Sequence, residues 1–286
     1  ATDVVSAKHA IKLAVRNPQR NATLNIGNAT QSNYAVHGNF YGANNNNGTV
    51  MGDVEVYVNA GTIGNGTGVQ SDVFGGGLGQ YTAVKGDVTV TVDSLTDVAA
   101  PIIYGDVYGG SAFGSVNDAS TDKTTVNIRS GSIRKTTTRG TTYGGDVYGG
   151  GLGVSKDSDK GNTYGTITVN IGETYTLEGS QGQDSTAYRG YATIGNNVYG
   201  ANNTGGSPQD NVNVNIFGTA HTADNLAEGG TEYAIDNVFG GGNYADYEPE
   251  GSGEYTASVN IFGCDNTVRR VFGGGDASAS PNVSNL

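Results

Sequence analysis

The sequence predicts an all-β fold, a right-handed parallel β-helix (β-solenoid) of about seven coils. Two observations predict it: a short Gly-rich phrase that recurs seven times, and an alternating strand pattern that recurs beside it. Each repeat is too small to bury a core alone, so it must stack on its neighbours. The right-handed sense follows the general preference of parallel crossover connections.

Each Gly-rich phrase places an apolar residue and an aromatic residue before glycine and further small residues, as in 107–111 (Val-Tyr-Gly-Gly-Ser). The step between successive aromatics varies from 33 residues (Tyr41 to Phe74) to 51 residues (Tyr148 to Tyr199), which indicates one unit with insertions of different length. The aromatic rings are therefore expected to form a column. This structural aromatic column comprises Tyr41, Phe74, Tyr108, Tyr148, Tyr199, Phe239 and Phe272.

A run of alternating β-branched and polar residues follows each phrase at a fairly steady distance and predicts a half-buried strand. A weaker third strand follows a glycine or similar turn at 61–63, 131–133 and 266–268. Each unit thus consists of three strands joined by turns, with like strands of successive units stacked about 4.8 Å apart. The alternating runs lie at 23–26, 54–58, 88–92, 125–128, 167–171, 212–216 and 258–261.

The turns of each unit also have a sequence signature. Glycine reaches positive φ at sharp bends and lets neighbouring backbones approach closely. An Asn or Asp before most phrases suits a turn in which the side chain binds nearby backbone amides. These positions are Asn39, Asp72, Asp106, Asp146, Asn197 and Asn237, with Arg270 in the last copy.

Three of these residues, Asp72, Asp106 and Asp146, are candidate metal ligands because they occupy equivalent positions in successive units. Their carboxylates could stack about 5 Å apart, and Ca²⁺ prefers carboxylate and carbonyl oxygens. The competing interpretation is turn bonding alone, which we favour because Asn alternates with Asp along the column. No other cofactor is expected.

The composition and charge of the chain limit the classes of partner that it is expected to bind. The chain has 286 residues, 48 of them glycine, a formal net charge of −12 and a pI near 4.5. Nucleic acid is not an expected partner, because binding its backbone requires clustered Lys and Arg. The sequence contains no run of about 20 apolar residues, so no membrane-spanning helix is predicted. Cys264 is the single cysteine, so no intrachain disulfide can form.

The two ends differ from the repeats. Residues 1–20 are predicted to form an N-terminal cap, a short helix or alternatively an irregular strand. Residues 21–286 are predicted to form the β-solenoid repeat domain, open at its C-terminal end, where a further strand would begin near Asn282. We expect either a longer array cut inside a repeat or an edge that pairs head to tail with another copy.

Polar insertions lie between the strands, at 136–143, 153–161, 177–192, 220–231 and 243–253. Loops that grow on one face of a solenoid commonly carry a binding surface. Tyrosines in these insertions could stack on sugar rings, although packing of the loops onto the body is the competing interpretation. They are Tyr143, Tyr188, Tyr191, Tyr233, Tyr244 and Tyr247.

The sequence contains few of the motifs that indicate catalysis. Enzymes of the β-helix class that act on polysaccharides need acids clustered with Arg or Lys on one outer face. The chain carries no Gly-x-Ser-x-Gly elbow and no P-loop. We therefore expect no catalytic activity and assign no catalytic residue.

The unit 237–243 (Asn-Val-Phe-Gly-Gly-Gly-Asn), followed by 258–263 (Ser-Val-Asn-Ile-Phe-Gly), resembles the Gly-rich β-solenoid repeats of large bacterial cell-surface, adhesin-like proteins. The resemblance covers residues 21–286 and carries no site residues. It implies a secreted or cell-surface protein with a role in attachment or an extracellular scaffold. The expected partners are neighbouring repeats or another copy at the solenoid ends, and a host glycan or protein. A filament-forming subunit and a polysaccharide-binding or polysaccharide-degrading β-helix are the alternatives.

Overall fold

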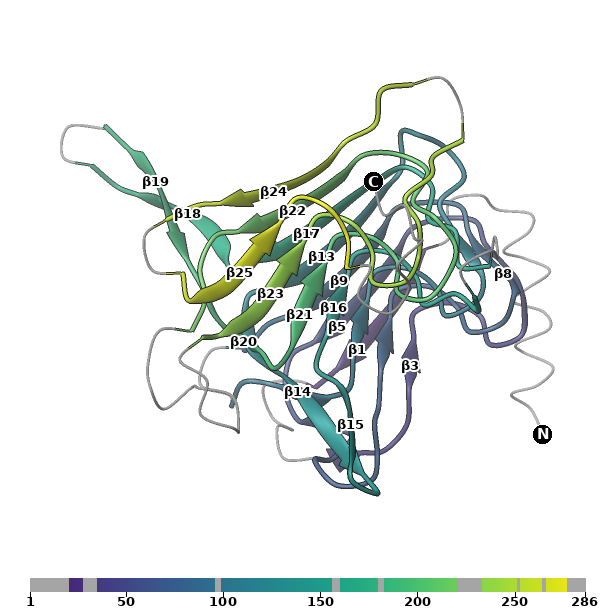
Figure 1. Cartoon of the computed structure of the whole chain (residues 1–286), viewed down its shortest axis with the longest axis horizontal. Coiled ribbons are helices and arrows are strands. Elements are labelled where there is room, and N and C mark those ends of the chain that lie inside the picture. The colour runs from purple at the N-terminus through teal and green to yellow at the C-terminus, as the bar shows by residue number, and fades with distance from the viewer. Residues whose placement is uncertain are drawn as a thin grey trace.

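The computed structural model describes residues 21–27, 35–95, 99–155, 160–179, 183–220, 233–250, 253–263 and 266–276. These residues form 25 β-strands, and none of them is helical (Figure 1). The predicted all-β class is confirmed. No helix in this part of the chain is long and apolar enough to cross a membrane. The predicted cap at 1–20 lies outside the described residues, as does Cys264.

The long-strand sheet is built from the alternating runs, and all its strands are parallel and in register. Its strands lie side by side in chain order, so the colours in Figure 1 run from purple to yellow across it. In spatial order they are β1 (Ala22–Ile26), β5 (Val54–Val58), β9 (Val88–Val92), β13 (Lys123–Ile128), β17 (Thr166–Ile171), β22 (Val212–Ile216) and β24 (Ala257–Ile261).

The aromatic sheet is built from the Gly-rich phrases and is also parallel throughout. Each phrase contributes a short strand that ends on its aromatic residue. In chain order the strands are β3 (Phe40–Tyr41), β7 (Val73–Phe74), β11 (Val107–Tyr108), β16 (Val147–Tyr148), β21 (Asn197–Tyr199), β23 (Ile235–Phe239) and β25 (Val268–Phe272).

A third sheet contains β2 (Ala35–Val36), β6 (Thr62–Ile63), β10 (Ile102–Tyr104), β14 (Ser130–Thr138) and β20 (Tyr191–Ile194) in parallel, with β15 (Thr141–Gly144) antiparallel to β14. A small parallel sheet joins β4 (Asn47–Val50), β8 (Tyr81–Val84) and β12 (Ser115–Val116). A separate hairpin pairs β18 (Glu173–Leu177) with β19 (Ser185–Arg189). The third strand expected at 266–268 is not in this sheet, because Val268 begins β25 of the aromatic sheet.

The chain passes through these sheets in a fixed order. From β1 it enters the third sheet at β2, the aromatic sheet at β3 and the small sheet at β4, and then returns to the long-strand sheet at β5. Each repeat therefore lays its strands beside the equivalent strands of the preceding repeat. Several parallel sheets built in this way agree with the coarse architecture that the sequence predicts.

The core lies where the inward residues of the long-strand, third and aromatic sheets meet. In β5 the side chains of Val54, Val56 and Val58 are fully buried, and the residues between them are half-buried. The same alternation recurs in β13, β17 and β22, and most of the inward valines and isoleucines of successive repeats form one apolar cluster. Burial of these side chains stabilises the stack by roughly 1.5–3 kcal/mol each.

The seven aromatic residues of the phrases form a continuous column. Ring centroids of neighbouring repeats lie 4.6–5.0 Å apart, with planes inclined by 4–10°. This spacing equals the distance between hydrogen-bonded strands, so the column follows directly from the register. Its members are Tyr41, Phe74, Tyr108, Tyr148, Tyr199, Phe239 and Phe272.

The first glycine of every phrase before the last is required by close packing of backbones. A Cβ added to Gly149 would lie 2.1 Å from the carbonyl oxygen of Gly200, and one added to Gly109 would lie 2.2 Å from that of Gly149. None of these first glycines has positive φ, so at these positions the close approach of backbones, and not a left-handed bend, requires glycine. Positive φ occurs instead at other turns, such as Gly172, where the chain leaves β17 for the hairpin.

Candidate functional site

The β18–β19 hairpin projects from the body beside the long-strand sheet (Figure 1). Its strands pair from Glu173 opposite Arg189 to Leu177 opposite Ser185. Most of the hairpin comes from the insertion expected at 177–192, and its Thr- and Tyr-rich runs favour extended backbone. The chain then continues through Gly190 into β20 of the third sheet.

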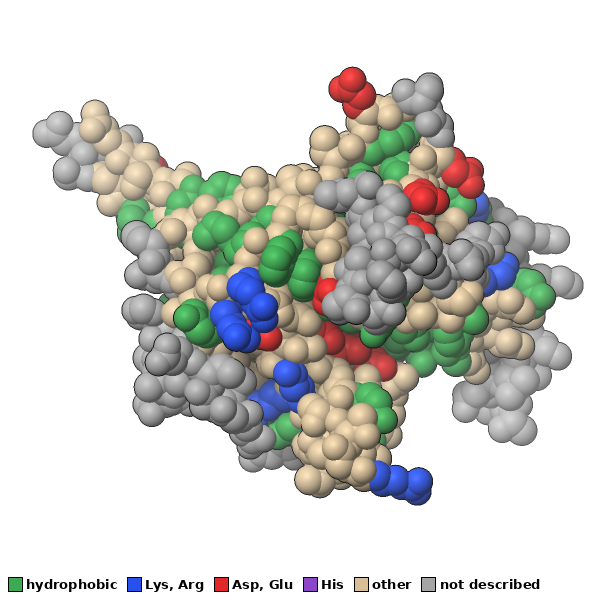
Figure 2. All heavy atoms as spheres, in the orientation of Figure 1, with side chains coloured by type: hydrophobic (Ala, Val, Ile, Leu, Met, Phe, Trp, Pro, Cys, Tyr) green, Lys and Arg blue, Asp and Glu red, His purple; other side chains and the backbone are tan. Residues whose placement is uncertain are grey.

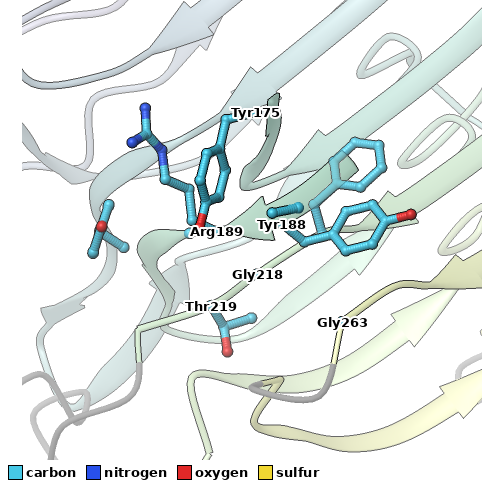
Figure 3. Close-up of a pocket in the computed structure, with 10 residues that line it drawn as sticks. Tyr175, Tyr188, Arg189, Gly218, Thr219 and Gly263 are labelled. Carbon is cyan, nitrogen blue, oxygen red and sulfur yellow. The ribbon is translucent and has the colours of Figure 1, made fainter. Parts of the chain in front are cut away.

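A cavity of about 450 Å³ lies at the base of this hairpin (Figure 3). Its walls come from three places in the chain: the hairpin with its continuation into β20, the turn after β22 and the turn after β24. Aromatic side chains and backbone make up most of the lining. The lining includes Tyr175, Tyr188, Arg189, Tyr191, Phe217 and Thr219.

Three stacked rings hold the hairpin on the body. The ring centroid of Tyr188 lies 6.0 Å from that of Phe217 and 5.5 Å from that of Phe262. Phe217 and Phe262 follow β22 and β24, and their centroids lie 5.1 Å apart. Each such pair contributes about 0.5–1.5 kcal/mol beyond burial of its area, so this cluster fixes one wall of the cavity.

A row of alternating charges runs along the turns that follow the long strands. Nε and Nη2 of Arg189 donate to Oε1 of Glu173 at 2.7 and 2.6 Å, and the guanidinium lies 4.9 Å from the ring centroid of Tyr175. The hydrogen bond and charge of Glu173 raise the pKa of Arg189. Arg129 contacts Glu173 at 3.3 Å and Asp93 at 3.6 Å. Two guanidinium groups thus balance two carboxylates beside the cavity.

This charge row was missed at the sequence level. Asp93 and Arg129 directly follow β9 and β13, whereas a glycine separates β17 from Glu173 and Arg189 is the last residue of β19. The signal that could have found it is the alternation of Asp93 and Arg129 directly after equivalent strands. Pairing of Arg189 with Glu173 depends on the hairpin, which was expected to be a loop.

The predicted Asn and Asp column is present, and it links the repeats to one another. Oδ1 of the first four members accepts a hydrogen bond of 2.9 Å from the backbone N–H of the equivalent residue one repeat later. The expected bonding to amides of the same turn is therefore wrong, because the amide belongs to the next repeat. The accepting residues are Asn39, Asp72, Asp106 and Asp146, and the last donor is Asn197.

Two of these aspartates are almost fully buried, with exposed fractions of 6% for Asp106 and 8% for Asp146. Burial, reinforced by the charges of Asp146 and Asp72, raises the pKa of Asp106 well above its usual range. Burial raises the pKa of Asp146 to about 6, against the opposing effect of the hydrogen bond from Asn197. Burial also raises the pKa of Asp72. The column therefore holds carboxyl groups that keep their protons to a higher pH than exposed aspartates do.

The same three residues are the calcium candidates Asp72, Asp106 and Asp146. Their Oδ1 atoms accept backbone amides, and Oδ2 of Asp106 accepts a hydrogen bond of 3.2 Å from the hydroxyl of Tyr108. Ca²⁺ requires six to eight oxygen ligands. Within the ranges that the structure describes, no three or more His, Cys, Asp and Glu side chains group in a way that could hold a metal ion. Calcium binding at the column stays a prediction.

The tyrosines expected to bind sugars lie in different settings. Tyr188 and Tyr191 both line the cavity, and Tyr191 is 65% exposed. Tyr247 is buried, and its hydroxyl donates to the backbone oxygen of Asp210 at 3.0 Å, so it packs its loop onto the body. The remaining three are exposed outside the cavity: Tyr143, Tyr233 and Tyr244.

The insertions do not share one corner of the molecule. The insertion at 177–192 follows a strand of the long-strand sheet, whereas those at 153–161 and 243–253 follow strands of the aromatic sheet. The insertion at 220–231 lies almost wholly outside the described residues. The insertion at 136–143 lengthens β14 and β15 at the third sheet, far from the β18–β19 hairpin in Figure 1. One common ligand surface formed by all of them is therefore not supported.

Comparison of the chain with protein-family models, curated proteins and solved structures found no match.

Proposed function

We propose that this chain is a right-handed parallel β-helix that serves as a non-catalytic structural or adhesive element, secreted or displayed on a bacterial surface. The observation that supports it best is the use of polar side chains to join successive repeats. Nδ2 of Asn170, Asn215 and Asn260 donates at 2.9–3.0 Å to Oδ1 of the Asn one repeat earlier, which for Asn170 is Asn127. Such ladders extend with every added repeat, as a scaffold requires.

The molecular surface agrees with this proposal. Much of the face in Figure 2 is uncharged, and its Lys, Arg, Asp and Glu side chains form small separate groups. Outward residues of the long-strand sheet are mainly Asn, Thr and Ser, as at Thr125, Thr168, Asn213 and Ser258. A polar, weakly charged surface of this kind suits a protein exposed outside the cell. Its proposed partners are neighbouring repeats or copies and a host glycan or protein.

Surface display tests the proposal. We expect a non-adherent bacterium that displays this chain to adhere to mucin-coated wells, because the loops and hairpin offer exposed tyrosines. The same cells should release no new reducing ends from pectin, alginate or mucin. Cells displaying an unrelated protein of similar size serve as the control. Cleavage of any of these polymers, or adherence no greater than that of the control, would contradict the proposal.

A filament-forming subunit is the second candidate, and the last described strands favour it. Ile261, Val271 and Phe272 expose 46%, 46% and 41% of their surface at the end of the stack, and another copy could cover them. Arg269 and Arg270 lie on β25 together with Val271 and Phe272. They disfavour pairing with another copy, because charged edge strands resist further pairing. Fibres in negative-stain images across a concentration series would support the filament, and isolated particles would exclude it.

A polysaccharide-binding or polysaccharide-degrading β-helix is supported by the charge row. Asp93, Arg129 and Glu173 place acids with arginine on an outer face beside the cavity. Each carboxylate is already paired with a guanidinium, so we favour binding over cleavage at this place.

A further inference from the structure

The hairpin cavity has the dimensions and lining of a small-molecule site. Its volume of about 450 Å³ lies within the roughly 300–1,000 Å³ typical of ligand pockets. Four of its ten lining residues are aromatic, and Arg189 and Thr219 add polar groups, a combination that is usual in such sites. The cavity lies at the base of the β18–β19 hairpin, which projects from the body (Figure 1).

The aromatic side chains are arranged to receive a flat, weakly polar face. Tyr188 is fixed by the rings of Phe217 and Phe262, so this wall is already ordered before binding. Tyr191 is 65% exposed at the start of β20, so its ring remains accessible. The face of an aromatic ring is electron-rich and therefore attracts the C–H bonds on one side of a sugar ring.

Arg189 also lines the cavity and supplies hydrogen-bond donors from the face of the hairpin opposite the Tyr188 ring. A guanidinium carries five N–H donors, and Glu173 accepts from Nε and Nη2. Donors therefore remain for hydroxyl groups of a ligand, while Glu173 and the ring of Tyr175 hold the guanidinium in one orientation.

The charges select among ligands of this shape. Asp93 and Glu173 neutralise Arg129 and Arg189, so no uncompensated positive charge in the row attracts an anion. The whole chain has a net charge of −12, which repels polyanions at a distance. A neutral ligand is therefore favoured over an acidic one.

From these observations we infer that the cavity at the base of the β18–β19 hairpin binds a neutral saccharide unit of a surface glycan. Tyr191 stacks on the sugar ring, and Arg189 donates to its hydroxyl groups. This inference rests on the proposed adhesive function and names where its ligand is held and of what chemical class it is.

Immobilised oligosaccharides test the inference directly. The probes are neutral oligosaccharides that end in galactose, mannose, glucose or N-acetylglucosamine, with sialylated and sulfated ones for comparison. We expect the chain to bind at least one neutral probe more tightly than any acidic one. Tyr191→Ala should weaken this binding about tenfold, whereas Tyr191→Phe keeps the ring and should retain it.

Tyr81→Ala is the matched control, because Tyr81 is 70% exposed on β8 and does not line the cavity. Its binding and that of the parent chain should be equal. Thermal unfolding of both Ala variants should match that of the parent, since both side chains are exposed. Binding of no neutral probe, preference for acidic probes, or equal binding by the Tyr191→Ala variant and the parent would overturn the inference.

The same variants separate this inference from the proposed function. If displayed Tyr191→Ala cells adhere to mucin as well as the parent does, the cavity is not the ligand site although adhesion stands. If the purified chain binds a neutral probe through Tyr191 but displayed cells do not adhere, the cavity assignment stands and the adhesive function is wrong.

Discussion

Buried aspartate is the residue-level feature with the clearest physical consequence. Asp106 and Asp146 occupy positions where other repeats carry Asn39 and Asn197, and all four belong to the same hydrogen-bond column. Asn and Asp both offer Oδ1 to the next repeat's amide, but only Asp can carry a charge. Because charge is costly in a buried site, the folded chain favours the protonated acid.

Stability should therefore fall as pH rises. The pKa of Asp146 is about 6 in the folded chain, against an ordinary value of 3.8, so the folded state binds more protons between these values. The stabilising effect of the proton is fully present below pH 3.8 and is lost as pH rises through about 6. This one group should lower the free energy of unfolding by up to about 3 kcal/mol between acid and neutral pH. Denaturant unfolding of Asp146→Asn should show a weaker pH dependence and a gain at pH 8.

The control for this prediction is Asp53→Asn. Oδ1 of Asp53 also accepts the amide of the next repeat, at 3.0 Å from Asp87 N, but Asp53 is exposed. Its substitution should leave the pH profile of unfolding close to that of the parent. An Asp146→Asn variant that is less stable than the parent at pH 8 would show that burial does not govern this column.

The sequence could predict the column of Asn and Asp residues because they precede nearly every Gly-rich phrase. It could not predict their hydrogen-bond partners. The partner amide of Asp146 is that of Asn197, 51 residues later, and it is reached only when the intervening insertion loops out. Register between repeats of unequal length depends on the packed sheets and is not contained in local spacing.

At the level of elements, the first glycine of each Gly-rich phrase decides how closely the strands of the aromatic sheet approach. Gly149→Ala should destabilise the chain by about 3 kcal/mol, because its Cβ would lie 2.1 Å from the oxygen of Gly200 and 2.5 Å from Ile167 Cγ2. Gly273 occupies the equivalent place in the last described repeat, and a Cβ there would meet no atom within 4 Å. Gly273→Ala is thus the matched control.

Thermal or denaturant unfolding of the two alanine variants measures this difference. Gly273→Ala should unfold close to the parent, because neither a contact nor a positive φ opposes its Cβ. The effect of alanine on the unfolded chain alone would stabilise both variants, so equal loss of stability in both would mean that contact between repeats does not decide the cost of alanine.

The two strand types differ in how well the sequence predicts them. The long strands follow from strict alternation, as in β5 and β22, where every second side chain is buried. The β18–β19 hairpin was expected to be a polar insertion. Most of its side chains are exposed, so its sequence lacks the alternation of apolar and polar residues that marks a half-buried strand. The cavity at its base was therefore also beyond sequence-based prediction.

At the scale of the whole molecule, the fold is a stack of repeats whose equivalent strands pair in register. Side-chain hydrogen bonds, aromatic rings and buried apolar side chains all recur with the spacing between neighbouring strands. Asn127, Asn170 and Asn215 lie directly opposite one another on β13, β17 and β22. The parallel, all-β architecture could be predicted because one short phrase recurs. The structure of the insertions could not, because insertions of different length occur at different turns and do not repeat from one unit to the next.

Cysteine pairs test this central claim most directly, in a chain whose Cys264 is replaced by serine. Neighbouring parallel strands lie about 4.8 Å apart, within the separation that a disulfide spans, whereas about 9.6 Å exceeds it. Asn127→Cys with Asn170→Cys, and Asn170→Cys with Asn215→Cys, should therefore lose their free thiols on mild oxidation. Asn127→Cys with Asn215→Cys should keep both thiols. Ready closure of that last pair, or no closure of the two neighbouring pairs, would contradict the stacked register.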